Sequence, residues 1–306
     1  MEFIREIESK KDLVLKSIEK YGCFPEHHFN HFIDLKEEDA VHVLVLFEDD
    51  MSLLTFHYEK SKTWWIITEP LAPFEKQSDI LLQFLNHVFE KEQAEKVLCE
   101  FTENFRKKIV ELLDKEGKLK ARSPAYSLFW PIFEMKNWDN SLTGKKWKII
   151  RNLRNYFLRE YEPELVTDIN TTSKEELNKL VKKWIETRHA NDRVDDEHYY
   201  NVIKNGFEGC DSVRIFTING KPVSITAGWK MPNSNNYYSA IGILDYDYKG
   251  IGEATNIDDL TELKKKGYDF VDFGGSNKGL FDFKLKFQPH FFYKTDFFTI
   301  IKQKEI

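Results

Sequence analysis

Residues 237–253 read YYSAIGILDYDYKGIGE, and this stretch decides how the second half of the chain folds. A strand-like run, 237–245, is followed by a loop that contains Gly250 and Gly252, and then by a helical pattern that continues to Lys266. Glycine lets backbone N–H groups approach an anion, and the N-terminus of the following helix carries partial positive charge. Because the helix dipole contributes only about 0.3–1 kcal/mol at an exposed terminus, several N–H donors would have to act together. We therefore predict that a phosphate-bearing donor is bound by Lys249, Gly250, Ile251, Gly252 and Glu253.

This loop matches neither of the two common nucleotide-binding motifs. No GKS or GKT follows its glycines, so it is not a Walker loop. The third glycine and the acidic residue of a dinucleotide-binding fingerprint are out of place. An ordinary turn between a strand and a helix would contain the same two glycines, and this alternative stays open.

The residues after the helix carry the candidate catalytic groups. Residues 268–276, YDFVDFGGS, read as a strand, and residues 279–289, GLFDFKLKFQP, read as a short basic helix. Asp272 lies inside the apolar strand, and a buried carboxylate needs a partner. It could orient an acceptor amine, pair with Lys284, or cap a neighbouring backbone N–H. On a helix, Lys284 and Lys286 diverge by about 200°, so only one of them would face the site. We favour Lys284 at the reacting carbonyl, with a solvated lysine beside core phenylalanines as the alternative.

Composition restricts the class of protein. At 306 residues the chain is long enough for two domains of ordinary size. A net charge of −6 argues against a general nucleic-acid coat, although it is compatible with a local basic face. Cys23, Cys99 and Cys210 are too few and too scattered for a disulfide framework or a zinc site, and they fit the reducing cytoplasm in which we expect the protein. No apolar run approaches the ~18–20 residues of a membrane span. The charged N-terminus lacks the apolar core of a signal peptide.

The same order of elements occurs twice along the chain, without detectable sequence identity between the halves. Each half reads as helices, three antiparallel strands, a helix, a strand, a helix and a strand. The first half contains predicted strands at 41–48, 52–59, 63–70, 96–102 and 127–135, with helices at 79–93 and 104–117. The second half contains predicted helices at 173–188 and 196–205, followed by strands at 212–219, 222–230 and 237–245. We therefore predict an N-terminal domain over 1–141, a basic linker helix over 142–163 and a C-terminal domain over 164–306.

Two local patterns in the second half indicate where elements begin and turn. Ser173 and Glu176 have the spacing of a capping box, which places a helix start at Ser173. Asn219 and Gly220 form an Asn-Gly pair, which is typical of a tight hairpin turn.

The two halves differ where the donor loop stands. At the position of KGIGE the first half has EPLAPFEK, residues 69–76, which contains Pro70 and Pro73 and no glycine. Proline removes backbone N–H donors, so this loop is poorly suited to hold a phosphate. We expect the second domain to hold the donor and the first to be structural or to shape the acceptor side.

The linker helix has one apolar face and one basic face. Six basic residues and no acidic residue lie within 145–159. At helical spacing, Trp147, Ile150, Leu153, Phe157 and Tyr161 share the apolar face. The basic face is either a solvated surface or a contact with an anion, which could be a nucleotide phosphate, an RNA backbone or a lipid headgroup.

Four basic side chains are the candidates for contact with the acceptor or with a polyanion. Arg154 falls at the edge of the apolar face, where a guanidinium group needs a partner. Arg188 ends an apolar helical stripe and either points toward the acceptor or forms a surface salt bridge. The remaining two candidates are Lys148 and Arg151.

We predict no metal site. His27, His28 and His31 read as a surface cluster, and His189 with Asp192 does not have a reliable metal-ligand spacing. Cys210 has no basic neighbour in sequence that would activate it as a nucleophile.

Four segments together resemble a known family. They are the KGIGE loop at 249–253, LTGKKWKIIRNLRN at 142–155, YDFVDFGGS at 268–276 and GLFDFKLKFQP at 279–289. The KGIGE loop, in its order of elements, resembles the GNAT acyltransferase fold. The other three segments resemble the C-terminal domain of phosphatidylglycerol lysyltransferases and their stand-alone relatives, and they are also similar to FemAB peptidyltransferases and CelD-type acetyltransferases. The resemblance implies an α+β fold of two tandem GNAT-like domains, each a mixed, mostly antiparallel central sheet flanked by helices.

The resemblance also implies a reaction. A transferase of this kind moves an aminoacyl group from aminoacyl-tRNA, or an acyl group from acyl-CoA, to an amine or hydroxyl on a small molecule, a peptide or a lipid headgroup. The donor is then a co-substrate, and no tightly bound cofactor is expected. A backbone N–H on the strand at 237–245 could stabilise the oxyanion. The basic linker helix favours aminoacyl-tRNA as the donor.

Two departures from the family pattern bear on the substrates. Tyr248 and Lys249 stand where typical acetyltransferases have Arg or Gln, which argues against acetyl-CoA. The membrane domain that usually precedes lipid-modifying members is not present in this chain, which argues against a lipid acceptor. Two other functions stay open: a catalytically inactive GNAT-like binding module, and an RNA-binding protein that uses the linker helix.

Overall fold

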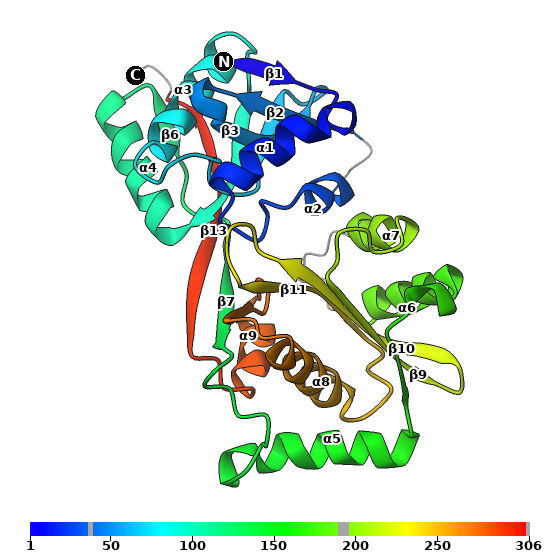
Figure 1. The fold of residues 1–306 in the computed structure, drawn as a ribbon. Coiled ribbons are helices and arrows are strands. Elements are labelled where there is room, and N and C mark those ends of the chain that lie inside the picture. The colour runs from blue at the N-terminus through cyan, green and yellow to red at the C-terminus, as the bar shows by residue number, and fades with distance from the viewer. Residues whose placement is uncertain (36–38, 189–195, 304–306) are drawn as a thin grey trace. The chain divides into compact units, whose positions relative to one another are not determined.

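The computed structural model describes residues 1–35, 39–188 and 196–303, which form an α+β fold, as predicted (Figure 1). The chain divides into two compact units. The first unit consists of Met1–Phe129, Met231–Ser234 and Tyr293–Ile306, and the second of Trp130–Lys230 and Asn235–Phe292.

The first unit is built on a mostly antiparallel sheet. Its strand order is β1 (Glu2–Ile4), β2 (Ala40–Leu46), β3 (Ser52–Tyr58), β4 (Thr63–Ile66), β5 (Lys96–Thr102) and β13 (Phe291–Lys302), and β6 (Leu119–Ala121) also pairs with β13. Only β4 and β5 run parallel, because the helix between them carries the chain back to the same edge.

Helices cover both faces of this sheet. The helices of the unit are α1 (Lys11–Tyr21), α2 (Phe29–Asp34), α3 (Gln77–Glu90) and α4 (Glu103–Glu116). On one face Phe84 and Leu85 of α3 pack with Trp64, and on the other Val14 of α1 packs with Phe56. The predicted helix at 104–117 ends as expected, because Gly117 adopts a left-handed conformation with φ 70°.

The sheet of the second unit repeats this plan. Its order is β7 (Tyr126–Glu134), β12 (Phe270–Asp272), β11 (Tyr237–Leu244), β10 (Lys221–Lys230), β9 (Ser212–Ile218) and β8 (Glu164–Val166). Here β11 and β12 form the parallel pair, and the other pairings are antiparallel. The predicted hairpin between β9 and β10 is confirmed, because Asn219 and Gly220 both have positive φ.

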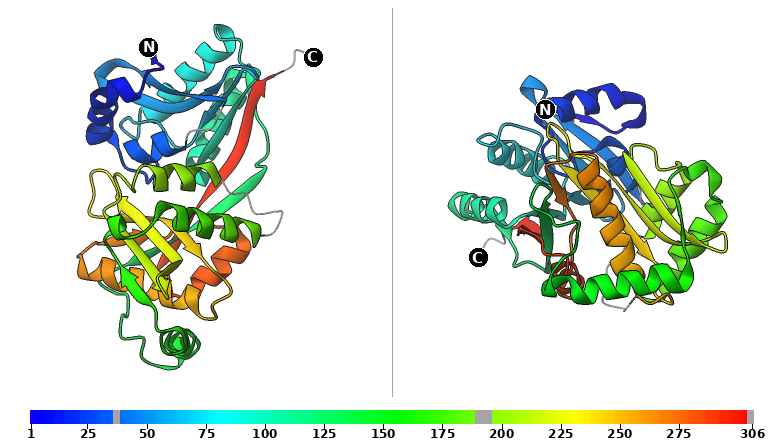
Figure 2. Two further views of the ribbon diagram at one scale, coloured as in Figure 1. Left: turned by 90° about the vertical axis from the view of Figure 1, so that its right-hand side faces the viewer. Right: turned by 60° about the horizontal axis from the view of Figure 1, so that its bottom comes forward.

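The helices of the second unit lie on both sides of its sheet. They are α5 (Lys148–Tyr161), α6 (Lys174–Glu186), α7 (Asp196–Lys204), α8 (Ile251–Lys265) and α9 (Lys278–Leu285). Ile225 of β10 packs toward α6 and α7, whereas Phe216 of β9 packs toward α8. The linker helix α5 packs on α8, and Figure 2 shows the two helices crossing.

The last strand of each half belongs to the sheet of the other unit. Strand β7, from the first half, pairs with β12 through Ile132, Phe133 and Glu134, and β13, from the end of the chain, pairs with β5. The duplicated element order does not reveal this exchange, because both strands are apolar and either partner would bury them.

Two expectations for local structure are corrected. Ser173 does precede α6, but its side chain makes no capping hydrogen bond within the described chain, so the capping box is wrong. The strand predicted at 268–276 is reduced to Phe270–Asp272, because the chain turns at Gly274 with φ 77°. In the parts of the chain that the structure describes, no helix has the length and apolar character needed to cross a membrane.

Candidate active site

The parallel strands of the second unit separate after two residue pairs. Tyr237 pairs with Val271 and Tyr238 with Asp272, and there β12 ends while β11 continues to Leu244. In the described residues, the later part of β11 therefore has no strand partner on this side. Gly242, in that part, is exposed, and no atom lies within 4 Å of where its Cβ would be. Strand pairing with β12 therefore ends at Tyr238, and a side chain added at Gly242 would meet no described residue.

A β-bulge lies where β11 leaves β12. Ala227 of β10 pairs with Ile241, but Gly228 pairs with Ser239, so Ala240 is an extra residue in β11. The bulge changes which face the odd-numbered residues occupy: Ser239 faces α8, whereas Ile241 packs toward α6 and α7.

Gly228 is required at the bulge. A Cβ at this position would lie 1.9 Å from the carbonyl oxygen of Tyr238, closer than atoms can approach. The bulge in β11 therefore depends on a glycine in β10, and no sequence motif indicates this role.

Lys284 lies beside this separation of strands. Its side chain is half-buried on α9, and its ammonium group donates to the carbonyl oxygens of Phe273 and Gly274, the latter at 3.1 Å. A Cβ at Gly274 would lie 3.4 Å from the carbonyl oxygen of Ser239 and 3.7 Å from Lys284 Nζ. Lys284 and the bulge thus border the same glycine. Lys286, by contrast, is exposed and lies over the ring of Phe283, which agrees with the predicted divergence of the two lysines.

The surroundings of Lys284 favour its neutral form. Burial lowers its pKa to about 7, the charge of Asp272 opposes this decrease, and the charge of Arg188 adds to it. A lysine with a pKa near 7 exists in both protonation states at neutral pH, which suits a group that exchanges protons during a reaction.

Asp272 is buried as predicted, but it is the last residue of β12 and not a residue inside a longer strand. Its carboxylate is buried and accepts a hydrogen bond of 2.9 Å from the backbone N–H of Gly274. It therefore caps the turn that carries Gly274, and it also acts on the charge of Lys284. The cap on a backbone N–H is thus present, whereas pairing with Lys284 and orientation of an acceptor stay predictions.

Arg188 follows the end of α6. Its guanidinium group lies 4.3 Å from the ring centroid of Trp184. Its charge contributes to lowering the pKa of Lys284. Lys284 and Asp272 both bond to Gly274, so the structure brings these two sequence-predicted site residues together.

The predicted donor loop is close to protein on two sides. Gly250 has φ 85°, and a Cβ there would lie 2.3 Å from the carbonyl oxygen of Leu153 on α5. A Cβ at Gly252 would lie 2.9 Å from the ring of Phe283 on α9. These glycines are needed because two helices approach the loop, a reason different from the one inferred from sequence. Donor binding by Lys249, Gly250, Ile251, Gly252 and Glu253 stays a prediction.

Lys249 also contacts α5. Its ammonium group lies 5.2 Å from the ring centroid of Tyr156. The loop before it is fixed by Lys183 of α6, which forms ion pairs of 2.7 Å with Asp245 and 2.6 Å with Asp247. The predicted donor loop therefore lies against the linker helix α5, through Lys249 and Tyr156.

Four cations on α5, three of them sequence-predicted candidates, have different surroundings. Lys148 and Arg159 are exposed, whereas Arg151 donates to the carbonyl oxygen of Leu142 and so holds the turn before the helix. Arg154 is half-buried and forms no hydrogen bond or ion pair with any residue in the described ranges. The expectation that Arg154 needs a partner is not met within this part of the chain.

The histidine cluster is not a surface feature, so that expectation is wrong. His27 is fully buried, its Nε2 lies 2.9 Å from the carbonyl oxygen of Glu69, and burial lowers its pKa to about 4. Its Nδ1 accepts from the backbone N–H of Cys23, so His27 holds chain segments together. No group of potential metal ligands occurs among the described residues, and His189 and Asp192 lie outside them.

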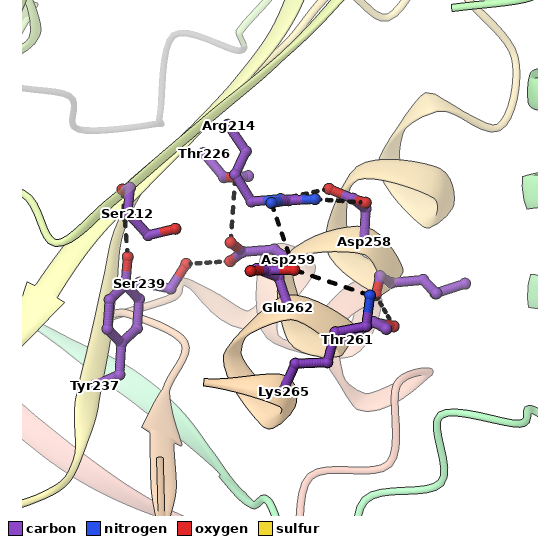
Figure 3. Close-up of polar contacts among 11 residues, drawn as sticks. Ser212, Arg214, Thr226, Tyr237, Ser239, Asp258, Asp259, Thr261, Glu262 and Lys265 are labelled. Atoms are coloured by element: carbon purple, nitrogen blue, oxygen red, sulfur yellow. Dashed lines mark hydrogen bonds and ion pairs between the residues drawn. The ribbon is translucent and has the colours of Figure 1, made fainter. Parts of the chain in front are cut away.

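Asp259 was missed by the sequence analysis. It is buried on α8 and accepts hydrogen bonds from Ser239 at 3.0 Å and Thr226 at 3.3 Å, as Figure 3 shows. Burial raises its pKa to about 6. Helical spacing could have identified it, because Asp259 stands four residues after Thr255 and four before Leu263, and both of these are buried.

Comparison with known proteins places this geometry in a family. Residues 47–295 match the family of the phosphatidylglycerol lysyltransferase C-terminal domain. No curated protein sequence matches the chain.

Solved structures share the fold over nearly the whole chain. L-PGS from Bacillus licheniformis has a TM-score of 0.65 at 12% identity, covering 99% of this chain and 93% of its own. FemX has a TM-score of 0.63 at 10% identity, covering 98% and 97%. A tandem GNAT protein from the clavulanic acid biosynthesis pathway has a TM-score of 0.58 at 10% identity, covering 100% and 99%. The predicted pair of GNAT-like domains is confirmed by these neighbours, and the sequence match shows that the chain belongs to the phosphatidylglycerol lysyltransferase C-terminal domain family.

Proposed function

We propose that this protein transfers an aminoacyl group from aminoacyl-tRNA to an amine or hydroxyl acceptor, with the reaction taking place beside Lys284 in the second unit. The observation that carries the proposal is the position of Lys284, a half-buried lysine with a pKa of about 7 where β11 and β12 separate. Membership of the family supports the class of reaction, and acyl-CoA is the alternative donor.

The reaction requires a nucleophile, a site for the oxyanion and a route for one proton. The acceptor nitrogen or oxygen bonds to the ester carbonyl carbon, and the bond from that carbon to the ribose oxygen of the donor breaks. Neutral Lys284 takes the proton that the acceptor loses, and the resulting ammonium group returns a proton to the departing oxygen. The irregular backbone at the β11 bulge offers N–H groups to the oxyanion.

The neighbours of Lys284 adjust its proton affinity. Asp272 favours the charged form and Arg188 the neutral form, so small movements of either group would change the balance. An acceptor that approaches between these charges would meet one carboxylate, which can orient an amine, and one guanidinium, which can hold an anionic group.

The linker helix supports tRNA as the donor. Lys148 and Arg159 are exposed on α5, Lys145 is exposed in the 3-10 turn just before it, and Arg154 has no partner within the described ranges. Phosphate groups are the partners that such cations bind in nucleic acids, and the same helix rests on the predicted donor loop. This arrangement would let one RNA strand contact α5 while its acylated end reaches β11.

The first test compares two lysines at the C-terminal end of α9. Purified protein would be incubated with cell extract as the acceptor source, with charged tRNAs and acyl-CoAs supplied separately, and products identified by their mass shift. We expect Lys284→Ala to lower turnover by about 10²–10⁴-fold, because it removes the proton carrier. Lys286→Ala, two residues away and exposed, should retain wild-type turnover. Equal turnover of the two variants would remove Lys284 from the reaction.

The second test addresses the donor. Lys145, Lys148 and Arg159, changed together to Glu, should abolish transfer from charged tRNA and leave acyl-CoA binding intact. Arg151 is left unchanged, because it holds the turn at Leu142. The control places the same charge change on the first unit, at the exposed residues Lys107, Lys115 and Lys118.

Salt and ligand binding separate the remaining functions. RNA binding through α5 should weaken steeply as salt increases, because it releases counterions from phosphates. RNA binding without any transfer would support an RNA-binding protein, and binding of neither charged tRNA nor acyl-CoA would support an inactive module. Transfer from acyl-CoA alone would replace tRNA as the donor.

A further inference from the structure

Asp259 links two strands from the helix that covers them. One carboxylate oxygen accepts from Ser239 of β11, and the other accepts from Thr226 of β10. Figure 3 shows both hydrogen bonds reaching from α8 to the sheet. A buried carboxylate is costly unless it is hydrogen-bonded, so these two hydroxyl groups determine how Asp259 can be accommodated.

The two hydroxyl groups stand on either side of the bulge. Ser239 is paired with Gly228, just before the extra residue Ala240, and Thr226 is paired with Gly242, just after it. Asp259 therefore spans the bulge and fixes the strands before and after it. An extra residue in a strand has no fixed partner in the ladder, so its direction depends on contacts of this kind.

The same bulge borders Lys284. The carbonyl oxygen of Ser239 and Lys284 Nζ both approach Gly274, as the positions around its Cβ direction show. A shift of Ser239 would thus move the backbone that faces Lys284. Nothing else in the described chain joins the side chain of Ser239 to another side chain.

We infer that Asp259 is a positioning residue: it holds the β11 bulge, through Ser239 and Thr226, in the geometry that presents backbone groups to the carbonyl beside Lys284. This inference rests on the proposed transfer reaction for its effect on catalysis, but not for its effect on the strand. Asp259 does not touch the reacting atoms itself.

Other charged groups lie near Asp259, so a control must show that changing one of them does not reproduce the effect of Asp259→Ala. Arg214 of β9 pairs with Asp258 at 2.7 Å and with Glu262 at 3.8 Å, and both of these acids are on α8. Tyr237 of β11 is the other titratable neighbour, and the charge of Asp259 contributes to raising its pKa. These neighbours supply a matched control, because Asp258 lies next to Asp259 on the same helix and does not contact the bulge.

The first measurement follows the strand without relying on activity. Hydrogen exchange of peptides that contain Ser239–Gly242 would be compared in the full-length wild-type protein, Asp259→Ala and Asp258→Asn. We expect faster exchange in Asp259→Ala only. Exchange at the wild-type rate in Asp259→Ala would overturn the inference, whether or not the transfer reaction has been found.

The second measurement separates positioning from folding. With turnover assayed well below the unfolding temperature and corrected for the folded fraction, Asp259→Ala should lower kcat by about 10–100-fold, as expected for a small displacement of a reacting group. KM for the donor should stay near the wild-type value. Asp259→Asn should restore most of kcat, because its amide can accept from one hydroxyl and donate to the other.

The outcomes distinguish the two proposals. Wild-type kcat in folded Asp259→Ala, or no recovery in Asp259→Asn, would contradict the positioning role. If the wild-type protein transfers nothing while exchange near Ser239 depends on Asp259, the proposed function fails and the structural part of the inference stands.

Discussion

In the first unit, the chain beyond the parallel strands is held closed, whereas in the second unit it is left apart. Strands β4 and β5 pair over four positions, and Glu69, just after β4, then accepts from Thr102 at the end of β5, at 3.0 Å from the backbone N–H and 2.7 Å from the hydroxyl. In the second unit the corresponding pairing stops after two positions. There the polar side chain on the first strand, Ser239, bonds to Asp259 of the covering helix.

The difference shows that the same strand order can leave two parallel strands either joined beyond their last paired residues or separated there. A carboxylate that reaches from one parallel strand to the next joins them, and a carboxylate that reaches from the helix joins β11 to α8 instead. The loops that follow agree with this. Pro70 and Pro73 follow the joined strands of the first unit, whereas Gly250 and Gly252 follow the separated strands of the second, where two helices approach the backbone.

The largest expected effect concerns Lys284, because a half-buried cation beside the point where β11 and β12 separate destabilises the folded state. Its pKa is about 7 in the folded protein, below the ordinary 10.5. Stability should therefore be lowest below pH 7, increase with pH between about 7 and 10.5, and reach its full value above that range. The cost of the charged form is at most about 5 kcal/mol.

Lys284→Met removes this cost. We expect the variant to be more stable than the wild type in urea unfolding at pH 6, with a smaller gain at pH 8 and almost none near pH 10.5, although it should be inactive in transfer. Lys286→Met is the control and should show no such trend. A gain in stability that did not change with pH would mean that the pKa of Lys284 is not lowered in the folded protein.

The bulge offers a second test with two glycines in neighbouring strands. Gly228→Ala would place a methyl group 1.9 Å from the carbonyl oxygen of Tyr238, so we expect it to destabilise the fold by about 3 kcal/mol and to abolish transfer. Gly242→Ala meets nothing within 4 Å and should change stability by less than about 0.5 kcal/mol.

The kinetics of Gly242→Ala would add a functional measurement to this test of stability. If the donor lies against the open part of β11, the added methyl group should increase KM for the donor while the unfolding midpoint stays unchanged. Equal destabilisation by Gly228→Ala and Gly242→Ala would contradict the difference between Gly228, whose Cβ position is blocked, and Gly242, whose Cβ position is not.

Regular elements and their buried faces could be predicted from sequence because both follow simple periods. The strands at 41–48 and 212–219, the helix of Lys284 and the burial of Asp272 all follow from alternation or helical spacing. The bulge could not, because Ser239 and Ile241 are both odd-numbered and yet lie on opposite faces of the sheet. Only the pairing with β10 shows the extra residue between them.

Side chains that act across long sequence separations were also beyond prediction. His27 reads as one of three surface histidines, but it is buried against the carbonyl oxygen of Glu69, forty-two residues away. The exchange of β7 and β13 is similar, because each strand is apolar and the choice of partner is made by the whole fold. Such features depend on tertiary contacts that leave no local period in the sequence.

Glu69 provides the mildest test of the comparison, in the closed unit. Glu69→Ala removes three hydrogen bonds, two from Thr102 and one from the hydroxyl of Thr68, and leaves the backbone N–H of Thr102 without its acceptor, so we expect a loss of about 1–3 kcal/mol in the free energy of unfolding. Glu69→Gln keeps an acceptor oxygen and should lose less. Neither variant should change kcat of the second unit, because the edge that Glu69 closes does not contain Lys284. If Glu69→Ala were as stable as the wild type, the carboxylate would not be what joins β4 to β5, and the contrast between a closed and an open edge would rest on backbone pairing alone.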